Sequence, residues 1–385
     1  MRGLGATVAI VLAAGLMAGW GPAAAAEGDG GQAPSYTPYR AWSLPLFERW
    51  ATRPYAAARM AAADGVAFVG TREGRLMAVE ADSGAIRWAR DLGGRISGGP
   101  TVGDGDRVYV GTSAGEVWAL AADSGQTQWR SPVSSEVITV PRVAAGMVMV
   151  RTADDFLWAL RAADGGERWS FNVEGRSLAL RGGSRPAFAD GRVFAGFSTG
   201  ELVALESGNG KPAWRETVAT SSGRTELERM VDVDAAPRVV EGMVIAAAYN
   251  GAVVAVDAAN GQQLWQRKFS VYNDLVVAND RVFVTTAKGE VIALDRSGGG
   301  TLWSQKALTD AGSLSPPVLT ERAVVVGDGL GRVSWFARDT GRLLGQIDLG
   351  PSAVHGAPLP VGGGVVLALS DQGTLNRIGL PGAGD

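Results

Sequence analysis

The sequence of 385 residues contains no cysteine and a single histidine, His355. The lack of cysteine excludes disulfides, thiolate nucleophiles, iron–sulfur clusters and cysteine-type zinc sites. With one histidine, we expect neither a histidine-based metal site nor a Ser-His-Asp catalytic arrangement. Most classes of enzyme are therefore excluded, and we predict a protein that has no catalytic residue, no metal and no cofactor.

The chain also has few charged residues and no run of basic ones. Charged residues make up 19% of it, and 36 lysines and arginines against 39 acidic residues give a net charge of −3. A mildly acidic chain without a basic patch is a poor candidate for binding nucleic acid or anionic lipid. The 55 glycines show no collagen period, so we interpret them as turn residues.

Residues 1–26 have the three parts of a secretory signal peptide. Arg2 supplies the positive charge, an apolar run extends from Ala6 to Ala18, and small residues follow. That run is shorter than a typical transmembrane helix, and no later stretch contains 18 uninterrupted apolar residues. We therefore predict cleavage after Ala26, export and a soluble mature protein, with a buried core helix as the alternative interpretation of the segment.

One strand-forming unit recurs along the rest of the chain at intervals of about 40 residues. In each copy an alternating strand follows a small turn residue, and a second hairpin lies upstream, which makes four strands per unit. The eight copies of this strand begin at Gly74, Gly115, Asp155, Gly200, Gly251, Gly289, Gly331 and Gly373. The repeats predict an all-β fold, an eight-bladed β-propeller of four-stranded antiparallel blades.

A tryptophan follows the turn after most of these strands. We expect the tryptophans to lie on outermost strands and to pack between blades as core, not as a sugar-binding stack; they are Trp88, Trp129, Trp169, Trp214, Trp265 and Trp303. In the seventh unit Gly345 stands where the tryptophan is expected. The last unit has no tryptophan after it, whereas Trp50 has no strands before it. We therefore predict that an N-terminal strand containing Trp50 completes the eighth blade, which removes an open sheet edge.

The predicted boundaries follow from the signal peptide and the repeats. After residues 1–26 we expect a flexible tail over 27–40, the propeller over 41–380 and a short tail over 381–385. We also expect the propeller itself to be monomeric.

The repeat, Ala-Leu or Ala-Val followed by a turn and Gly-x-x-x-Trp, resembles the repeat of the quinoprotein superfamily. The WD40 family fits less well, because one histidine cannot supply its Gly-His pairs. Quinoprotein dehydrogenases are similar in their blades and hold pyrroloquinoline quinone with calcium and a catalytic aspartate. Their chains are much longer, and the alcohol dehydrogenases carry a vicinal cysteine pair that this chain lacks. A periplasmic dehydrogenase dependent on pyrroloquinoline quinone is the alternative function.

Two connections between units are longer than the others, from Trp169 to Pro186 and from Trp214 to Pro237. Their extra segments, together with residues 270–274, resemble the BamB family of outer-membrane β-barrel assembly factors over nearly all of the mature chain. The resemblance implies a non-enzymatic scaffold subunit of the β-barrel assembly (BAM) complex at the periplasmic face of the bacterial outer membrane. Such proteins usually carry a lipid on an N-terminal cysteine, whereas Trp20 stands at that position here and makes a lipid anchor doubtful.

The long segments, 177–184 and 223–234, combine apolar and charged side chains. We predict that they bind a protein partner through Leu178, Leu180, Arg181, Arg229, Asp232 and Asp234. An apolar centre with a charged rim is typical of protein interfaces, and segments from consecutive units should emerge side by side. The alternative is that the leucines fill a gap between blades and the aspartates cap turns.

The resemblance names the partner more closely. In the BamB family the matching leucine, arginine and paired aspartate positions contact a periplasmic domain of the barrel subunit BamA, and through it the BAM complex. We also consider binding of unfolded outer-membrane proteins to exposed strand edges by β-augmentation.

Overall fold

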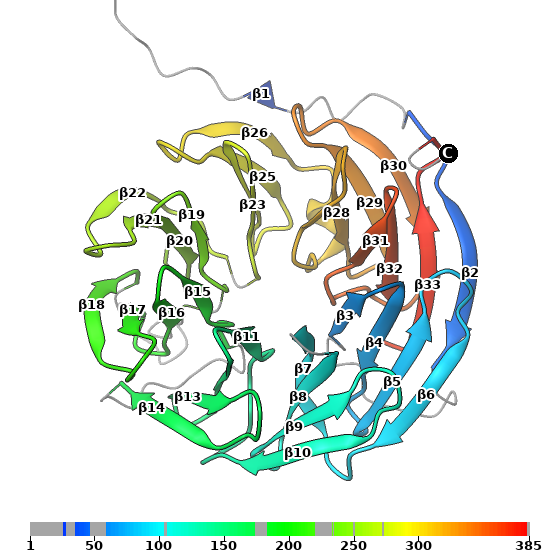
Figure 1. Cartoon of the computed structure of the whole chain (residues 1–385). Helices are drawn as coiled ribbons and strands as arrows, with labels where there is room; N and C mark the ends of the chain where they lie inside the picture. Colours follow the sequence, from blue (N-terminus) through cyan, green and yellow to red (C-terminus); the bar gives the residue numbers. More distant parts are fainter. Residues whose placement is uncertain are drawn as a thin grey trace, which may run out of the picture.

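The computed structural model describes residues 26–27, 35–46, 59–103, 106–173, 183–219, 233, 235–248, 251–271 and 273–382. These residues form eight four-stranded antiparallel sheets that are arranged as blades around a central axis (Figure 1). The predicted eight-bladed propeller is therefore confirmed. Within the described ranges the only helix is a short 3-10 turn, η1 (Thr309–Ala311), which precedes blade 7, and no helix in them is long and apolar enough to cross a membrane.

We number the blades in chain order and give their strands from the axis outward. Blade 1 contains β3 (Met60–Ala63), β4 (Val66–Gly70), β5 (Arg75–Glu80) and β6 (Ile86–Asp91). Blade 2 contains β7 (Ile96–Gly103), β8 (Arg107–Thr112), β9 (Glu116–Ala121) and β10 (Thr127–Pro132). Blade 3 contains β11 (Arg142–Ala144), β12 (Met147–Arg151), β13 (Phe156–Arg161) and β14 (Glu167–Asn172). Blade 4 contains β15 (Ala187–Ala189), β16 (Arg192–Gly196), β17 (Glu201–Glu206) and β18 (Pro212–Thr217). Blade 5 contains β19 (Arg238–Val240), β20 (Met243–Ala247), β21 (Val253–Asp257) and β22 (Gln263–Arg267). Blade 6 contains β23 (Val276–Ala278), β24 (Arg281–Thr285), β25 (Val291–Asp295) and β26 (Thr301–Gln305). Blade 7 contains β27 (Val318–Leu319), β28 (Ala323–Gly327), β29 (Arg332–Ala337) and β30 (Leu343–Asp348). Blade 8 contains β31 (Leu359–Gly362), β32 (Val365–Leu369), β33 (Thr374–Gly379) and, as its outer strand, β2 (Tyr39–Pro45).

The core lies between neighbouring blades. The second strands of blades 1, 3, 7 and 8 are buried at every position, because other blades cover both faces of the sheet. Outer strands such as β6 and β22 are mostly exposed. Between blades 4 and 5, for example, Leu202 and Ala204 pack against Ala246 and Val254. Each blade therefore depends on its neighbours for burial of its apolar faces, as repeat architectures do.

In blades 1 to 6 the outer-strand tryptophan lies opposite an alanine of the third strand, beside a β-bulge. The pairs are Trp88 with Ala78, Trp129 with Ala119, Trp169 with Ala159, Trp214 with Ala204, Trp265 with Ala255 and Trp303 with Ala293. Each indole Nε1 donates to a backbone carbonyl of the next blade at 2.7–3.0 Å. The ring rests on a turn glycine of that blade: a Cβ on Gly341 would lie 2.5 Å from Trp303 Cε3. Each of these tryptophans therefore joins its blade to the next.

The N-terminus supplies the outer strand of blade 8, as predicted, but not with the predicted tryptophan. Strand β2 pairs antiparallel with β33, outside it in the ring (Figure 1). Trp42 takes the position of the blade tryptophan, and its Nε1 donates to Asp82 O of blade 1 at 2.9 Å. Trp50 lies outside the described residues. The placement of the strand around Trp50 was wrong, because β2 already fills the edge of β33 between Tyr39 and Pro45.

The absence of a tryptophan from the outer strand of blade 7 also has a steric cause. There the large residue moves to the third strand, where buried Trp335 lies opposite Gly345. The N-terminal segment crosses this point before it enters β2, and Tyr36 N donates to Leu344 O at 2.8 Å. A Cβ on Gly345 would lie 2.9 Å from Pro38 Cγ and 3.1 Å from the Tyr36 carbonyl oxygen. Glycine is required because the chain passes over it.

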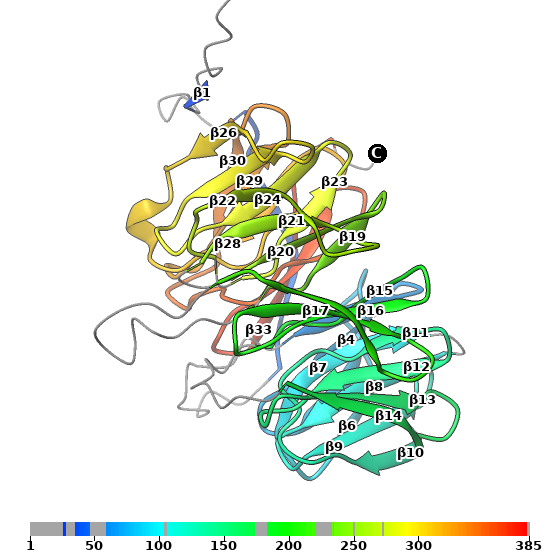
Figure 2. The same ribbon diagram turned by 90° about the vertical axis from the view of Figure 1, so that its left-hand side faces the viewer.

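A short fifth strand extends blade 6. Strand β1 (Ala26–Glu27) pairs parallel with β26 and lies at the edge of the ring (Figure 2). It includes the residue after which we predict cleavage. The edge of β26 therefore accepts an additional strand.

Candidate functional site

The two long connections start and end on one face of the propeller. In a four-stranded antiparallel blade, the connection to the next blade and the turn between the second and third strands lie at the same end. We call this side the connection face and the other the opposite face. All the predicted partner-binding residues belong to these two connections and lie outside the described residues: Leu178, Leu180, Arg181, Arg229, Asp232 and Asp234. The structure describes the bases from which these segments leave the propeller.

The bases of the two connections touch each other. Ser184, at the end of the first, is fully buried, and its Oγ donates to the carbonyl oxygen of Ala235, at the end of the second, at 3.1 Å. Val233 is also fully buried, and its N–H donates to Phe197 O at 3.4 Å. It packs on Gly196, where a Cβ would lie 2.4 Å from Val233 Cγ1. The described bases of both connections therefore lie side by side at blade 4.

A buried ion pair lies beneath these bases. Arg151, at the end of β12, is 1% exposed and pairs with Asp155 in the following turn. Asp155 also accepts a hydrogen bond from Ser198 Oγ of blade 4, and the Arg151 guanidinium stacks over the Phe197 ring at 4.8 Å. Since Phe197 O accepts from Val233 N–H at the base of the second connection, the network couples blade 3 to that base.

The sequence contains a signal for this ion pair. Asp155 adopts φ 64°, whereas glycine occupies the equivalent turn position, also with positive φ, in blades 1, 2, 4, 6, 7 and 8. A non-glycine residue at positive φ is uncommon. An aspartate in a series of turn glycines therefore marks a place where a side-chain interaction offsets the backbone cost.

The third segment of the resemblance, residues 270–274, contacts the same region. Asp274 Oδ1 accepts a hydrogen bond from Ala236 N at 2.8 Å, immediately after the second connection. Asn273 Nδ2 donates to Leu314 O at 2.7 Å, in the connection that leads to blade 7. The described ends of the two long connections thus lie next to Asp274, around blades 4 to 6.

The only histidine forms an arrangement that we did not expect. His355 Nδ1 lies 2.6 Å from Asp371 Oδ2, and its Nε2 lies 2.7 Å from Ser313 Oγ. The expectation that no Ser-His-Asp arrangement forms was wrong, because a single imidazole has two nitrogens and needs no second histidine. The hydrogen bond to Asp371 raises the pKa of His355 above its ordinary value against the opposing effect of burial. The three residues come from two connections and a turn of blade 8, so their hydrogen bonds link blades 6 to 8.

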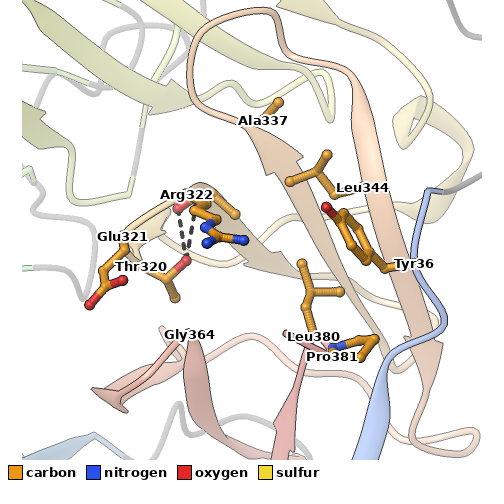
Figure 3. Close-up of a pocket in the computed structure, with 10 residues that line it drawn as sticks. Tyr36, Thr320, Glu321, Arg322, Ala337, Leu344, Gly364, Leu380 and Pro381 are labelled. Atoms are coloured by element: carbon orange, nitrogen blue, oxygen red, sulfur yellow. Dashed lines mark hydrogen bonds between the residues drawn. The ribbon is translucent and has the colours of Figure 1, made fainter. Parts of the chain in front are cut away.

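A cavity on the opposite face has a different origin. It has a volume of about 220 Å³ between blades 7 and 8 and is lined in part by Tyr36, Leu344 and Leu380 (Figure 3). It lies where Gly345 replaces a blade tryptophan, and the N-terminal segment and Leu380 fill the space only partly.

The described residues contain no cluster of three or more histidine, cysteine or acidic side chains that could hold a metal.

The comparisons with known proteins point to one family. The family model described as outer membrane protein assembly factor BamB matches residues 39–105, 72–305 and 287–379. The BamB of Vibrio cholerae is 39% identical over 315 residues, which cover 81% of each chain. The chain belongs to the BamB family.

Other members of the BamB family agree with this match. The Escherichia coli K12 protein is 33% identical over 353 residues, which cover 89% of each chain. The crystal structure of BamB from Moraxella catarrhalis superposes with a TM-score of 0.79 at 23% identity, over 89% of this chain and all of that one. The quinohemoprotein alcohol dehydrogenase of Comamonas testosteroni has a TM-score of 0.69 at 15% identity, over 91% of this chain and 77% of that one. At these identities the two structures show the shared fold alone.

Proposed function

We propose that this protein is a non-enzymatic scaffold subunit of the BAM complex, which assists the folding and insertion of outer-membrane proteins. Membership of the BamB family, whose curated members are named outer membrane protein assembly factors, carries the proposal. The geometry supports binding, because the two long connections that depart from the repeat have bases that touch each other on one face.

The partner is a periplasmic domain of BamA, bound through the two long segments. Leu178, Leu180 and Arg181 act from the first segment. Arg229, Asp232 and Asp234 act from the second. Two observations support this assignment: the Ser184–Ala235 hydrogen bond holds the bases together, and the buried Arg151–Asp155 pair fixes the turn beneath them. A preorganised base lowers the entropic cost of ordering an interface.

Export and attachment complete the proposal. Residues 1–26 direct the chain to the periplasm, and the propeller, which includes β2 from Tyr39 onward, acts there as a monomer at the periplasmic face of the outer membrane. Because Trp20 occupies the position of the usual lipidated cysteine, the contact with the membrane assembly is made through BamA. Unfolded outer-membrane proteins add strands to exposed blade edges; the pairing of β1 with β26 supports such β-augmentation.

A pull-down with the purified periplasmic domains of BamA tests this function. The protein should be retained, whereas the variants Leu180→Ala/Arg181→Ala and Asp232→Ala/Asp234→Ala should be lost while they remain folded. The matched control is Asp280→Ala/Asp339→Ala, which removes two exposed aspartates from the opposite face. If the folded connection-face variants bind as the unchanged protein does, the interface is wrong. If the unchanged protein binds nothing, the function itself fails.

The alternative, a dehydrogenase dependent on pyrroloquinoline quinone, predicts a different outcome. Purified protein reconstituted with the quinone and calcium would show a stoichiometric cofactor spectrum and dye-linked dehydrogenase activity. We expect neither. The structural likeness to a quinohemoprotein dehydrogenase extends to the fold only.

A further inference from the structure

Four arginines from different blades meet near the axis of the propeller, at the connection face. They stand at or just before the first residue of an inner strand, and they are Arg59, Arg142, Arg185 and Arg238. A cavity of about 140 Å³ is lined by three of them, from blades 3, 4 and 5. Figure 1 shows the strands that follow them, β3, β11, β15 and β19, around the centre of the ring.

Two contacts across the axis show how closely these side chains converge. Arg185 Nη2 donates to Thr101 Oγ1, on the inner strand of blade 2, at 3.1 Å. Arg59 Nη1 of blade 1 lies 4.0 Å from Asp274 Oδ2 of blade 6. The arginines therefore point into a shared axial space.

The positive charge in this space is poorly balanced within the part of the chain that the structure describes. The acid beside the arginines there is Asp274, whose other oxygen accepts from Ala236 N. In the same part of the chain, the buried Nε atoms of Arg142 and Arg185 have no hydrogen-bond partner. An unpaired buried charge or donor is destabilising, so a group that pairs with these atoms would stabilise the fold.

The protonation equilibrium of Arg185 reflects the same crowding. Burial, followed by the neighbouring charges of Arg142 and Arg238, lowers the pKa of Arg185 to about 10. Burial lowers the pKa of Arg142 as well, with a further contribution from Arg238. Both effects disfavour charge on the arginines, and the negative charge of an anion bound between them would oppose both.

We propose that the axial cavity binds a small multivalent oxyanion, a phosphate or a dicarboxylate. Guanidinium groups present planar pairs of N–H donors that match the oxygens of both chemistries. The cavity admits such a ligand together with a few waters, since one water takes about 30 Å³ of liquid volume. The site differs from the partner-binding segments, and the proposal does not depend on binding to BamA.

Isothermal titration of the purified mature protein with inorganic phosphate and with succinate tests the site. Chloride at matched ionic strength is the control for general screening. We expect saturable binding of at least one probe. Arg185→Met and Arg142→Met should each weaken it by about tenfold or more, since each removes a charge-assisted contact. Arg281→Met is the matched control, because that arginine lies in a pocket of the opposite face beside Asp280 and Asp339 and its loss should leave binding unchanged.

Thermal unfolding of the axial variants gives a second readout, measured first in chloride and then with added phosphate or succinate. Because removal of one cation relieves repulsion among the others, Arg185→Met should unfold at the same temperature as the unchanged protein or higher in chloride. Its unfolding temperature should no longer rise when phosphate or succinate is added. The proposal is overturned if the unchanged protein binds neither probe, or if both axial variants fold and bind as tightly as the Arg281→Met control.

Discussion

Trp303 is the blade tryptophan whose loss should damage the fold most. It is 1% exposed, its Nε1 donates to Arg338 O at 3.0 Å, and its ring lies 6.0 Å from that of Phe283. Truncation of a buried aromatic residue to alanine costs about 3–5 kcal/mol, more where the surroundings cannot collapse. Trp303→Ala should therefore lower the free energy of unfolding by about 5 kcal/mol.

Trp88 provides the matched control. It makes the same kind of contacts, an Nε1 hydrogen bond to Ala122 O at 2.9 Å and a ring contact with Phe68 at 6.0 Å, but it is partly exposed. Trp88→Ala should cost about 3 kcal/mol, at the lower end of the range. Trp303→Phe keeps most of the apolar volume and should cost about 1–2 kcal/mol for the lost hydrogen bond. Urea titrations followed by far-UV circular dichroism measure all three. Equal losses for the two alanine variants, or a larger loss at Trp88, would refute the reasoning.

Three further predictions concern single positions. Gly345→Trp restores the repeat pattern yet should destabilise the protein by about 1–3 kcal/mol through overpacking against the N-terminal segment, which thermal unfolding and limited proteolysis of that segment would detect. Asp155→Gly relieves a positive φ but leaves the buried charge of Arg151 without its partner, so urea titration should show a net loss of about 2–3 kcal/mol; a gain in stability would contradict this. The pKa of His355 is raised in the folded protein, so its stabilising contribution is complete below the unfolded-state pKa of about 6.5 and is lost as pH rises through the folded-state value. Urea titrations should therefore show a larger deficit for His355→Gln at pH 5.5 than at pH 8.5, and a deficit that grows with pH would contradict the sign.

The repeat made most of the fold predictable, since its turn residues and tryptophans mark both ends of each outer hairpin. The same logic explains the error at the N-terminus. A blade tryptophan is recognised by the turn just before it, but β2 follows no such turn, because its neighbour β33 lies at the other end of the chain. Trp42 therefore carries no local signal. The requirement for Gly345 depends on the same distant segment.

The site was predictable only where the sequence departs from the repeat. The two long connections were visible as extra length, and the structure describes their adjacent bases; the roles of the residues within them remain predictions. The Arg151–Asp155 pair was visible only as a substitution in a series of turn glycines. Arg185 and its axial neighbours carry no signal at all, because a single arginine before a strand is unremarkable and only closure of the ring brings four together.

The most direct test of the partner-binding face is hydrogen–deuterium exchange of the purified protein with and without the periplasmic domains of BamA. We predict that binding slows amide exchange in residues 177–184 and 223–234 and in the turn at 152–155. Exchange at the turns of the opposite face, including the one before β24, should not change. Protection confined to the opposite face, or no protection in either long segment under saturating partner, would contradict the proposed interface.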